Sequence, residues 1–332
     1  IKSKKYKEIS KREKAIKEAV NNLNTGEILI IAGKGHEKIQ DFGKKKIYFS
    51  DKKFILESIK IKNSNLTNNI KLNIIKEVSG NKNMLPNLSF HQATIDSKKI
   101  KKNDIFFAIK GKNNDGNAFI GEAIKKGASI IVSDKLRHKI NNKNIIRKKN
   151  SLNFMTKLSS GLRSSFNGQI IGITGSCGKT SLKDLLASCL NKFGRVSFSP
   201  KSYNNKYGVP LSLFNLNQNN NYGIFEIGMD KKGEIDFLSN IIKPNIGIIT
   251  NISYAHAKNF NNILEIAKAK SEIINNIKRH GFLVLNADDK FFSFHKKIAK
   301  KRKLNVISFG YSNKSDIKLL KLKKFKKSFK IQ

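Results

Sequence analysis

The sequence predicts an α/β protein built around a doubly wound, mostly parallel sheet. A partial α/β domain and a small α/β domain precede this sheet in the chain. Between residues 169 and 309, short apolar runs typical of buried strands alternate with amphipathic segments of helical period. This alternation is typical of a parallel sheet with helices on both faces. A glycine-rich loop directly follows the first of these apolar runs. With 332 residues, the chain is long enough for two or three domains with cores of their own.

The first 62 residues are predicted to form a helix and two strands. Apolar residues from Ala15 to Leu23 recur at helical spacing, and Gly26 follows as a C-terminal glycine. Two apolar runs then predict strands at 28–32 and 44–49.

A stretch rich in Asn and Lys follows at 63–87, and we interpret it as a linker and the start of the next domain. It has room for one short helix around 70–78. Residues 88–150 are predicted to form the small α/β domain. Its expected elements are strands at 104–109 and 129–132 and a helix at 118–126. An amphipathic helix at 152–166 is expected to follow it.

The largest predicted domain covers residues 151–310. We expect strands at 170–174, 222–227, 246–250, 282–285 and 304–309, with helices at 179–192, after Gly233, at 262–278 and at 290–300. Ligands of such sheets gather at the carboxyl ends of the strands. The polar residues at those ends are therefore candidates for a site: Glu226, Asn251, His256, Asn286, Asp288 and Asp289.

The loop after the first of these strands has the spacing of a P-loop. Gly175 and Gly178 let backbone N–H groups turn toward an anion, and the following helix points its positive end at the same place. Lys179 could reach phosphate oxygens, and Thr180 offers a hydroxyl to a magnesium ion. Ile173 stands where the longer form of the motif has glycine, so an ordinary strand–turn–helix is the alternative. The candidate phosphate-binding residues are Gly175, Ser176, Cys177, Gly178, Lys179, Thr180 and Ser181.

Charge and cysteine content limit the function classes. Lys and Arg number 66 against 24 Asp and Glu, a formal net charge of +42, which could indicate a nucleic-acid partner. The lysines are spread over the whole chain among many Asn and Ile, so an A/T-rich genome explains them better. Cys177 and Cys189 form no disulfide framework and fit a reduced, cytoplasmic protein. No signal peptide and no apolar run of about 18 residues is present.

Several spaced motifs together resemble the Mur ligases, the ATP-dependent amide-forming enzymes of peptidoglycan precursor synthesis. The loop at 175–180 is similar to that family's ATP loop, which also lacks the first glycine. Within the family, the D-alanyl-D-alanine-adding branch is most similar. The segments that carry this likeness are Tyr203–Pro210, Glu226–Met229 with Gly233–Ile235, Asn251–His256, Ala267–Ile273 and Asn286–Asp289.

The N-terminal side extends the resemblance. Three segments resemble the UDP-sugar domain of the same branch, although Asn117 stands where the family usually has histidine: Thr94–Ile100, Asp104–Gly111 and Asp115–Phe119. Residues 9–52 instead resemble the C-terminal end of the tripeptide-forming branch, in which Gly33 and Glu37 would contact a diamino acid. The implied domains are a remnant at 1–62, the linker at 63–87, a UDP-sugar-binding domain at 88–150, an ATP-binding domain at 151–310 and the start of a further domain at 311–332.

The resemblance implies a reaction in which ATP phosphorylates a carboxylate of UDP-MurNAc-tripeptide and D-Ala-D-Ala displaces the phosphate. Lys179 would bind the β- and γ-phosphates. The implied magnesium residues are Thr180, Glu226, His256 and Lys270, the last as the carbamylated lysine of the family. Asn286 and Asp288 would lie at the adenine. The implied substrate residues are Asp96, Ser97, Asn204 and Asn205.

We expect a cytoplasmic monomer that is a piece of a two-ligase fusion and does not turn over by itself. Two alternatives stay open. One is another Mur-type ligase, either tripeptide-forming or similar to folylpolyglutamate ligases. The other is a basic nucleic-acid-binding protein.

Overall fold

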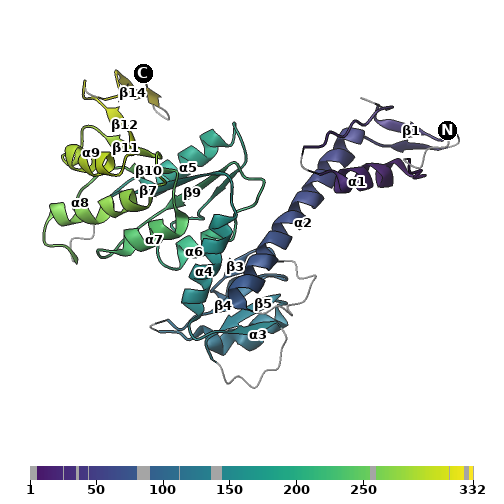
Figure 1. Cartoon of the computed structure of the whole chain (residues 1–332), viewed down its shortest axis with the longest axis horizontal. Coiled ribbons are helices and arrows are strands. Elements are labelled where there is room, and N and C mark those ends of the chain that lie inside the picture. The colour runs from purple at the N-terminus through teal and green to yellow at the C-terminus, as the bar shows by residue number, and fades with distance from the viewer. Residues whose placement is uncertain are drawn as a thin grey trace. The chain divides into compact units, whose positions relative to one another are not determined.

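The computed structural model describes residues 6–24, 26–34, 37–43, 45–80, 90–111, 113–135, 144–254, 259–313, 315–324 and 329–331. The chain divides into two compact units, Ile1–Ile70 and Lys71–Gln332 (Figure 1). In the described part of the chain, no helix combines the length and the apolar character that a membrane span requires.

The first unit contains helix α1 (Arg12–Asn22), a hairpin of β1 (Ile39–Asp41) and β2 (Lys46–Tyr48), and the first part of helix α2 (Asp51–Ser79). The Arg12 guanidinium holds the unit together, because it donates to both Asp51 carboxylate oxygens, at 2.8 and 2.6 Å, and to the carbonyl of Ala32. The helix predicted over Ala15–Leu23 is confirmed as α1, which begins a few residues earlier and ends one residue earlier. The strand predicted at 44–49 is confirmed as β2.

Two predictions for this part of the chain were wrong. Residues 28–32 form no strand, since Ile28 and Ile30 are 88% and 84% exposed and pair with no neighbouring strand. Only the alternate residues Leu29 and Ile31 pack on the small core of Ile16, Val20 and Phe49. The early part of 63–87, expected to be linker, is helical, because it belongs to α2. The helix predicted around 70–78 is confirmed as the end of α2, whose Leu72 and Ile75 are buried against the next domain's core.

The small sheet consists of four parallel strands in the order β3-β4-β5-β6. Their bounds are Ala93–Thr94, Ile105–Ala108, Ile130–Ser133 and Ile145–Arg147. Alternate residues of β4 enter different cores: Ile105 and Phe107 meet helix α4 (Ser151–Ser164), whereas Phe106 and Ala108 meet helix α3 (Ile120–Lys125). The short strands β3 and β6 were not predicted.

The large sheet is the predicted parallel sheet, with seven strands in the order β13-β12-β11-β10-β7-β9-β8 and parallel pairing throughout. In chain order its strands are β7 (Gln169–Thr174), β8 (Val196–Phe198), β9 (Tyr222–Glu226), β10 (Ile246–Ile249), β11 (Phe282–Asn286), β12 (Asn305–Gly310) and β13 (Ile317–Lys318). The edge strands β8 and β13 were not predicted. A hairpin of β14 (Leu322–Lys324) and β15 (Phe329–Ile331) follows.

Helices cover both faces of this sheet, as a doubly wound fold requires (Figure 1). Helix α5 (Lys179–Leu190) packs on Ile171 and Ile173 of β7. Ile170 faces the opposite core, to which the other helices and the 3₁₀ segment η4 contribute. These elements are α6 (Gly208–Leu213), α7 (Glu234–Ile242), α8 (Ile263–Ser271), η4 (Glu272–Asn276) and α9 (Phe292–Lys301).

Candidate active site

The glycine loop joins β7 to α5 at the carboxyl end of the large sheet. Gly175 has φ +144°, and a Cβ there would lie 1.9 Å from the Thr250 hydroxyl oxygen, so glycine alone fits. Gly178 is left-handed at φ +78° and directly precedes the first residue of α5, Lys179. The strand, loop and helix therefore follow one another as predicted, and the first turn of α5 presents N–H groups that have no intrahelical acceptor.

The segment after β10 holds this loop in place. Asn251 accepts the Ser176 N–H at its carbonyl (2.9 Å) and the Cys177 N–H at its side-chain oxygen (3.0 Å). Ser176 and Ser253 exchange two hydrogen bonds of 3.0 and 2.9 Å, and Thr250 donates to the Cys177 carbonyl at 2.7 Å. Sequence reasoning placed Asn251 at the site but missed Thr250 and Ser253, although hydroxyl residues directly after a strand were the available signal.

Two lysines donate hydrogen bonds to the same backbone carbonyl of the loop, that of Gly175. Lys179 donates to Gly175 O at 2.8 Å, and Lys270 on α8 donates to the same oxygen at 3.0 Å. Lys270 is 1% exposed. Burial, followed by the nearby Lys179 charge, lowers the pKa of Lys270 to about 7. A large share of this amine is therefore neutral near neutral pH.

Glu226, at the end of β9, is 1% exposed and hydrogen-bonded at both carboxylate oxygens. The Thr180 hydroxyl donates to Oε2 at 2.7 Å, and the Asn204 amide donates to Oε1 at 2.8 Å. The structure thus brings Thr180 and Glu226 together. Carboxylate and hydroxyl oxygens fit Mg²⁺, which proteins usually bind through one or two carboxylates plus phosphate oxygens. Within the described ranges, no three His, Cys, Asp or Glu residues form a metal cluster of their own.

The residues expected at the adenine make mainly backbone contacts. Asn286 accepts the Asp288 N–H at 3.0 Å. Asp288 in turn accepts the N–H groups of Tyr311 (2.7 Å) and Ser312 (2.9 Å), so both of its oxygens fix the turn after β12. Asp289 accepts the Ile252 N–H at 2.8 Å and ties this turn to the segment after β10. Contacts of Asn286 and Asp288 with a base stay a prediction.

Three further expectations concern positions near the loop. His256 lies outside the described residues. Ser181 is exposed in the first turn of α5. The Asn205 side-chain oxygen accepts the N–H groups of Tyr207 (3.1 Å) and Gly208 (3.0 Å), so it caps the start of α6, a role that sequence reasoning did not assign.

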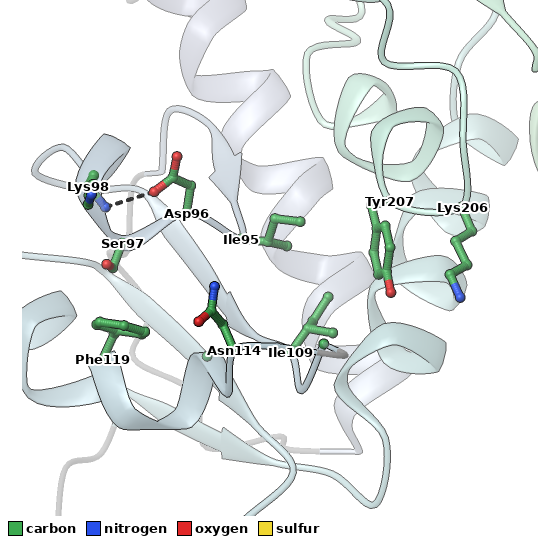
Figure 2. Close-up of a pocket in the computed structure, with 11 residues that line it drawn as sticks. Ile95, Asp96, Ser97, Lys98, Ile109, Asn114, Phe119, Lys206 and Tyr207 are labelled. Atoms are coloured by element: carbon green, nitrogen blue, oxygen red, sulfur yellow. Dashed lines mark hydrogen bonds between the residues drawn. The ribbon is translucent and has the colours of Figure 1, made fainter.

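A cavity of about 800 Å³ lies beside the small sheet, and Asp96 and Ser97 line it (Figure 2). Asp96 accepts the Lys98 N–H at 3.0 Å and lies 3.4 Å from the Lys99 ammonium. Lys206 and Tyr207, from the segment before α6, lie across the cavity from these residues (Figure 2).

The position at which the family usually has histidine belongs to a hydrogen-bond network next to this cavity. Asn117 is 2% exposed, and its amide donates to Asp115 and Asp134, both at 2.7 Å, while its oxygen accepts the Ser133 hydroxyl at 2.7 Å. Asparagine therefore satisfies its neighbours here without a titrating ring.

A second cavity, of about 640 Å³, adjoins the glycine loop. Lys179, Asn204 and Asn205 line it, together with residues at the start of α7. Lys206 and Tyr207 line both cavities, which therefore meet at this corner. Sequence reasoning missed these two residues, although they lie between the predicted Asn205 and Gly208.

Comparisons with known proteins agree with this arrangement. Residues 89–156 match the Mur ligase family catalytic domain, and residues 173–332 match the Mur ligase middle domain. The UDP-N-acetylmuramoyl-tripeptide–D-alanyl-D-alanine ligase of Buchnera aphidicola is 34% identical over 75% of this chain and 55% of the relative. The enzyme of the same name from Rickettsia prowazekii is 38% identical over 69% of this chain and 51% of the relative.

The solved structure of the MurF ligase of Thermotoga maritima in complex with ADP is similar, with a TM-score of 0.64 and 29% identity. That match covers 74% of this chain and 56% of the Thermotoga chain. The present chain spans about half the length of the relatives it matches. Since the two domain matches cover the small and the large sheets, the chain belongs to the Mur ligase family.

Proposed function

We propose that this chain contains the UDP-sugar-binding and ATP-binding domains of a ligase that joins D-Ala-D-Ala to UDP-MurNAc-tripeptide. One observation carries the proposal: the loop lysine Lys179 and Asn204, which donates to Glu226, line a cavity that shares Lys206 and Tyr207 with a second cavity. Relatives named for this reaction support it. They do not favour a folate-type ligase or a nucleic-acid-binding protein.

The chemistry needs charge neutralisation at the phosphates rather than a protein nucleophile. Lys179 and the first turn of α5 would bind the β- and γ-phosphates of ATP. Thr180 and Glu226 would hold Mg²⁺, which supplies further charge neutralisation when bound. The substrate carboxylate takes the γ-phosphoryl group, ADP leaves, and the dipeptide amine then displaces phosphate from the acyl phosphate to form the amide.

Lys270 fits the family's carbamylated lysine on physical grounds. Carbamylation joins a neutral amine to CO₂ and releases a proton, so it requires the deprotonated form. Burial lowers the pKa of Lys270 to about 7 and supplies that form near neutral pH. The product is an anion, which would relieve the repulsion from Lys179 and support a magnesium ion. His256 would assist with a second ion, a prediction that lies outside the described residues.

The nucleotide-sugar substrate would span the two cavities. Its UDP group would occupy the cavity of Asp96 and Ser97, and its peptide would reach toward Lys179 past the corner of Lys206 and Tyr207. Asn204 and Asn205 line the second cavity, where the peptide would end.

The organisation of the chain is part of the proposal. Residues 1–62 would be a remnant of a tripeptide-forming ligase, 88–150 and 151–310 the two working domains, and 311–332 the start of the closing domain. A cytoplasmic monomer is expected.

Binding is the appropriate test, because the chain spans about half of its relatives and we expect no turnover. Calorimetry should show Mg²⁺-dependent ATP binding and separate binding of UDP-MurNAc-tripeptide. Lys179→Ala should weaken ATP binding at least about 100-fold, since it removes the charge at the phosphates. Lys192→Ala is the control and should bind normally, because Lys192 is exposed and lies just after the end of the same helix.

Unchanged ATP affinity in Lys179→Ala would refute the proposed role of the loop. Binding of a folate in place of UDP-MurNAc-tripeptide would favour the folate-type ligase. Tight DNA or RNA binding with a steep salt dependence would favour the nucleic-acid alternative.

A further inference from the structure

The chain contains a fully buried lysine for which the proposed chemistry has no use. Lys183 lies on α5, one turn after Thr180, and is 0% exposed. Residues three apart on a helix share a face. Lys183 therefore points to the same side of α5 as the hydroxyl that donates to Glu226.

The Lys183 ammonium has a specific backbone partner. It donates to the carbonyl of Lys201, and its nitrogen lies 6.0 Å from the centre of the Phe198 ring. Asp184 is 3.4 Å away, but its side chain is 59% exposed, so this ion pair is screened by solvent. A buried ammonium is costly unless it is hydrogen-bonded, which makes the Lys201 carbonyl its principal compensation.

Lys201 lies in the segment that delivers Asn204 to the site. Its φ of +47° is unusual for a residue with a side chain, so the turn depends on outside contacts. The segment is fixed at its two ends. Ser199 bonds to β9 through its N–H to Ile224 O (3.0 Å), and the Asn204 carbonyl accepts the Gly228 N–H (2.7 Å). Lys183 connects α5 to the middle of this segment, residues 199–204, through its hydrogen bond to the Lys201 carbonyl.

The contacts form a closed ring. Thr180 and Lys183 leave the same helix. The Thr180 hydroxyl donates to one oxygen of Glu226, and Lys183 donates to the carbonyl of the Lys201 turn. Asn204, three residues after Lys201, donates to the other oxygen of Glu226 and closes the ring. Movement of the Lys201 turn would shift the Asn204 amide and, with it, the orientation of a carboxylate that is 1% exposed.

We propose that Lys183 is a positioning residue that sets the Glu226 carboxylate for the magnesium–nucleotide complex by holding the Lys201 turn, through which Asn204 reaches Glu226. This inference rests on the proposed function, because it assigns Glu226 to the metal. Lys183 touches neither substrate nor metal in this arrangement. Groups that orient a metal ligand typically contribute about 10- to 100-fold to metal affinity.

The experiment measures the Mg²⁺ concentration at half-maximal binding of a fluorescent ATP analogue to the whole chain. Lys183→Met keeps the packed stem and removes the charge. We expect its midpoint to rise at least about 10-fold, and Lys183→Arg, which can still donate to the carbonyl, to restore most of the loss.

Lys71→Met is the matched control. Lys71 is also a buried lysine that donates to a backbone carbonyl, Phe214 O at 2.7 Å, but it lies on α2 and not at the loop. A purely structural effect would lower the stability of both variants and move neither midpoint. If Lys183→Met leaves the Mg²⁺ midpoint unchanged, or if Lys71→Met shifts it equally, the inference is overturned.

A double-mutant cycle tests the route through Asn204. In an Asn204→Ala background, Lys183→Met should add less than about 2-fold to the midpoint, and full additivity would exclude that route. Where Lys183→Met does not fold, Lys183→Gln is judged by the same midpoint. Absence of Mg²⁺-dependent binding in the unchanged chain would refute the proposed function and this inference with it. Normal Mg²⁺-dependent binding in the unchanged chain, with the same Mg²⁺ midpoint in Lys183→Met, would refute this inference alone.

Discussion

The glycine loop and the cavity of the small sheet are both expected to bind phosphate groups, yet they are built differently. Around the loop, the charged side chains of Glu226 and Lys270 are each 1% exposed and are hydrogen-bonded to uncharged side chains or to the backbone. At the cavity, the side chain of the lining residue Asp96 is 42% exposed and lies 3.4 Å from the ammonium of Lys99, whose side chain is 63% exposed. Changes at the loop should therefore affect folding and binding together, whereas changes at the cavity should affect binding alone.

The largest expected effect comes from Gly175→Ala. The new Cβ would lie 1.9 Å from the Thr250 hydroxyl at a φ of +144°, so both overpacking and backbone strain apply. We expect a loss of about 3 kcal/mol or more in the free energy of unfolding. Urea denaturation measures it.

Gly178→Ala is the matched comparison, since a Cβ there meets nothing within 4 Å and only the left-handed φ of +78° is strained. It should cost about 1–2 kcal/mol. Equal losses for the two variants would show that the contact with Thr250 does not constrain the loop.

The next effect is a pH dependence at Lys270. Its folded-state pKa of about 7 lies below the ordinary value of 10.5, so the unfolded chain binds more protons between these values. The burial penalty is thus absent above pH 10.5, grows as the pH falls, and is complete below about pH 7. Lys270→Met should gain stability relative to the parent as the pH falls from 10.5 to 7.

The measurement is the difference between the two urea-denaturation curves at several pH values, with CO₂ excluded so that carbamylation does not contribute. A difference that is constant from pH 7 to 10.5 would mean that Lys270 is not desolvated as its burial indicates.

The smallest effect is expected at the open cavity. Asp96→Ala removes an acceptor for the Lys98 N–H at a solvent-exposed turn, so stability should change by less than about 0.5 kcal/mol. Binding of UDP-MurNAc-tripeptide should weaken about 3- to 10-fold, the value of one hydrogen bond. A large loss of stability would place Asp96 with the residues of the loop and remove the contrast between the two sites.

The sequence predicted the centre of the large sheet well because the central strands are buried on both faces and therefore appear as continuous apolar runs such as Ile170–Thr174. It failed where the outcome depends on a distant partner. The run at 28–32 is equally apolar but pairs with no strand in the described part of the chain. The edge strand β8 has only three residues, too few for a period to be recognised.

The same limit applies to the site. Glu226 was singled out as a polar residue at a strand end, and Lys270 through the resemblance to the Mur ligases. In the structure Glu226 accepts the Thr180 hydroxyl and Lys270 donates to the Gly175 carbonyl of the loop. Lys183 was not found, because one buried lysine cannot be recognised in a chain with 66 Lys and Arg residues. Burial follows from tertiary position. Lys206 and Tyr207 were missed for the same reason, since only the folded chain shows that two cavities meet there.

The bonds between the glycine loop and the segment after β10 also bear on the order of folding. The Cys177 N–H finds its acceptor 74 residues later, at Asn251, and Ser176 finds its partner 77 residues later, at Ser253. Contacts of such long sequence separation form late, because a large loop must close first. During synthesis, the glycine loop therefore leaves the ribosome long before the strand that shapes it, and a nascent chain that ends before residue 250 cannot yet hold a nucleotide in this way.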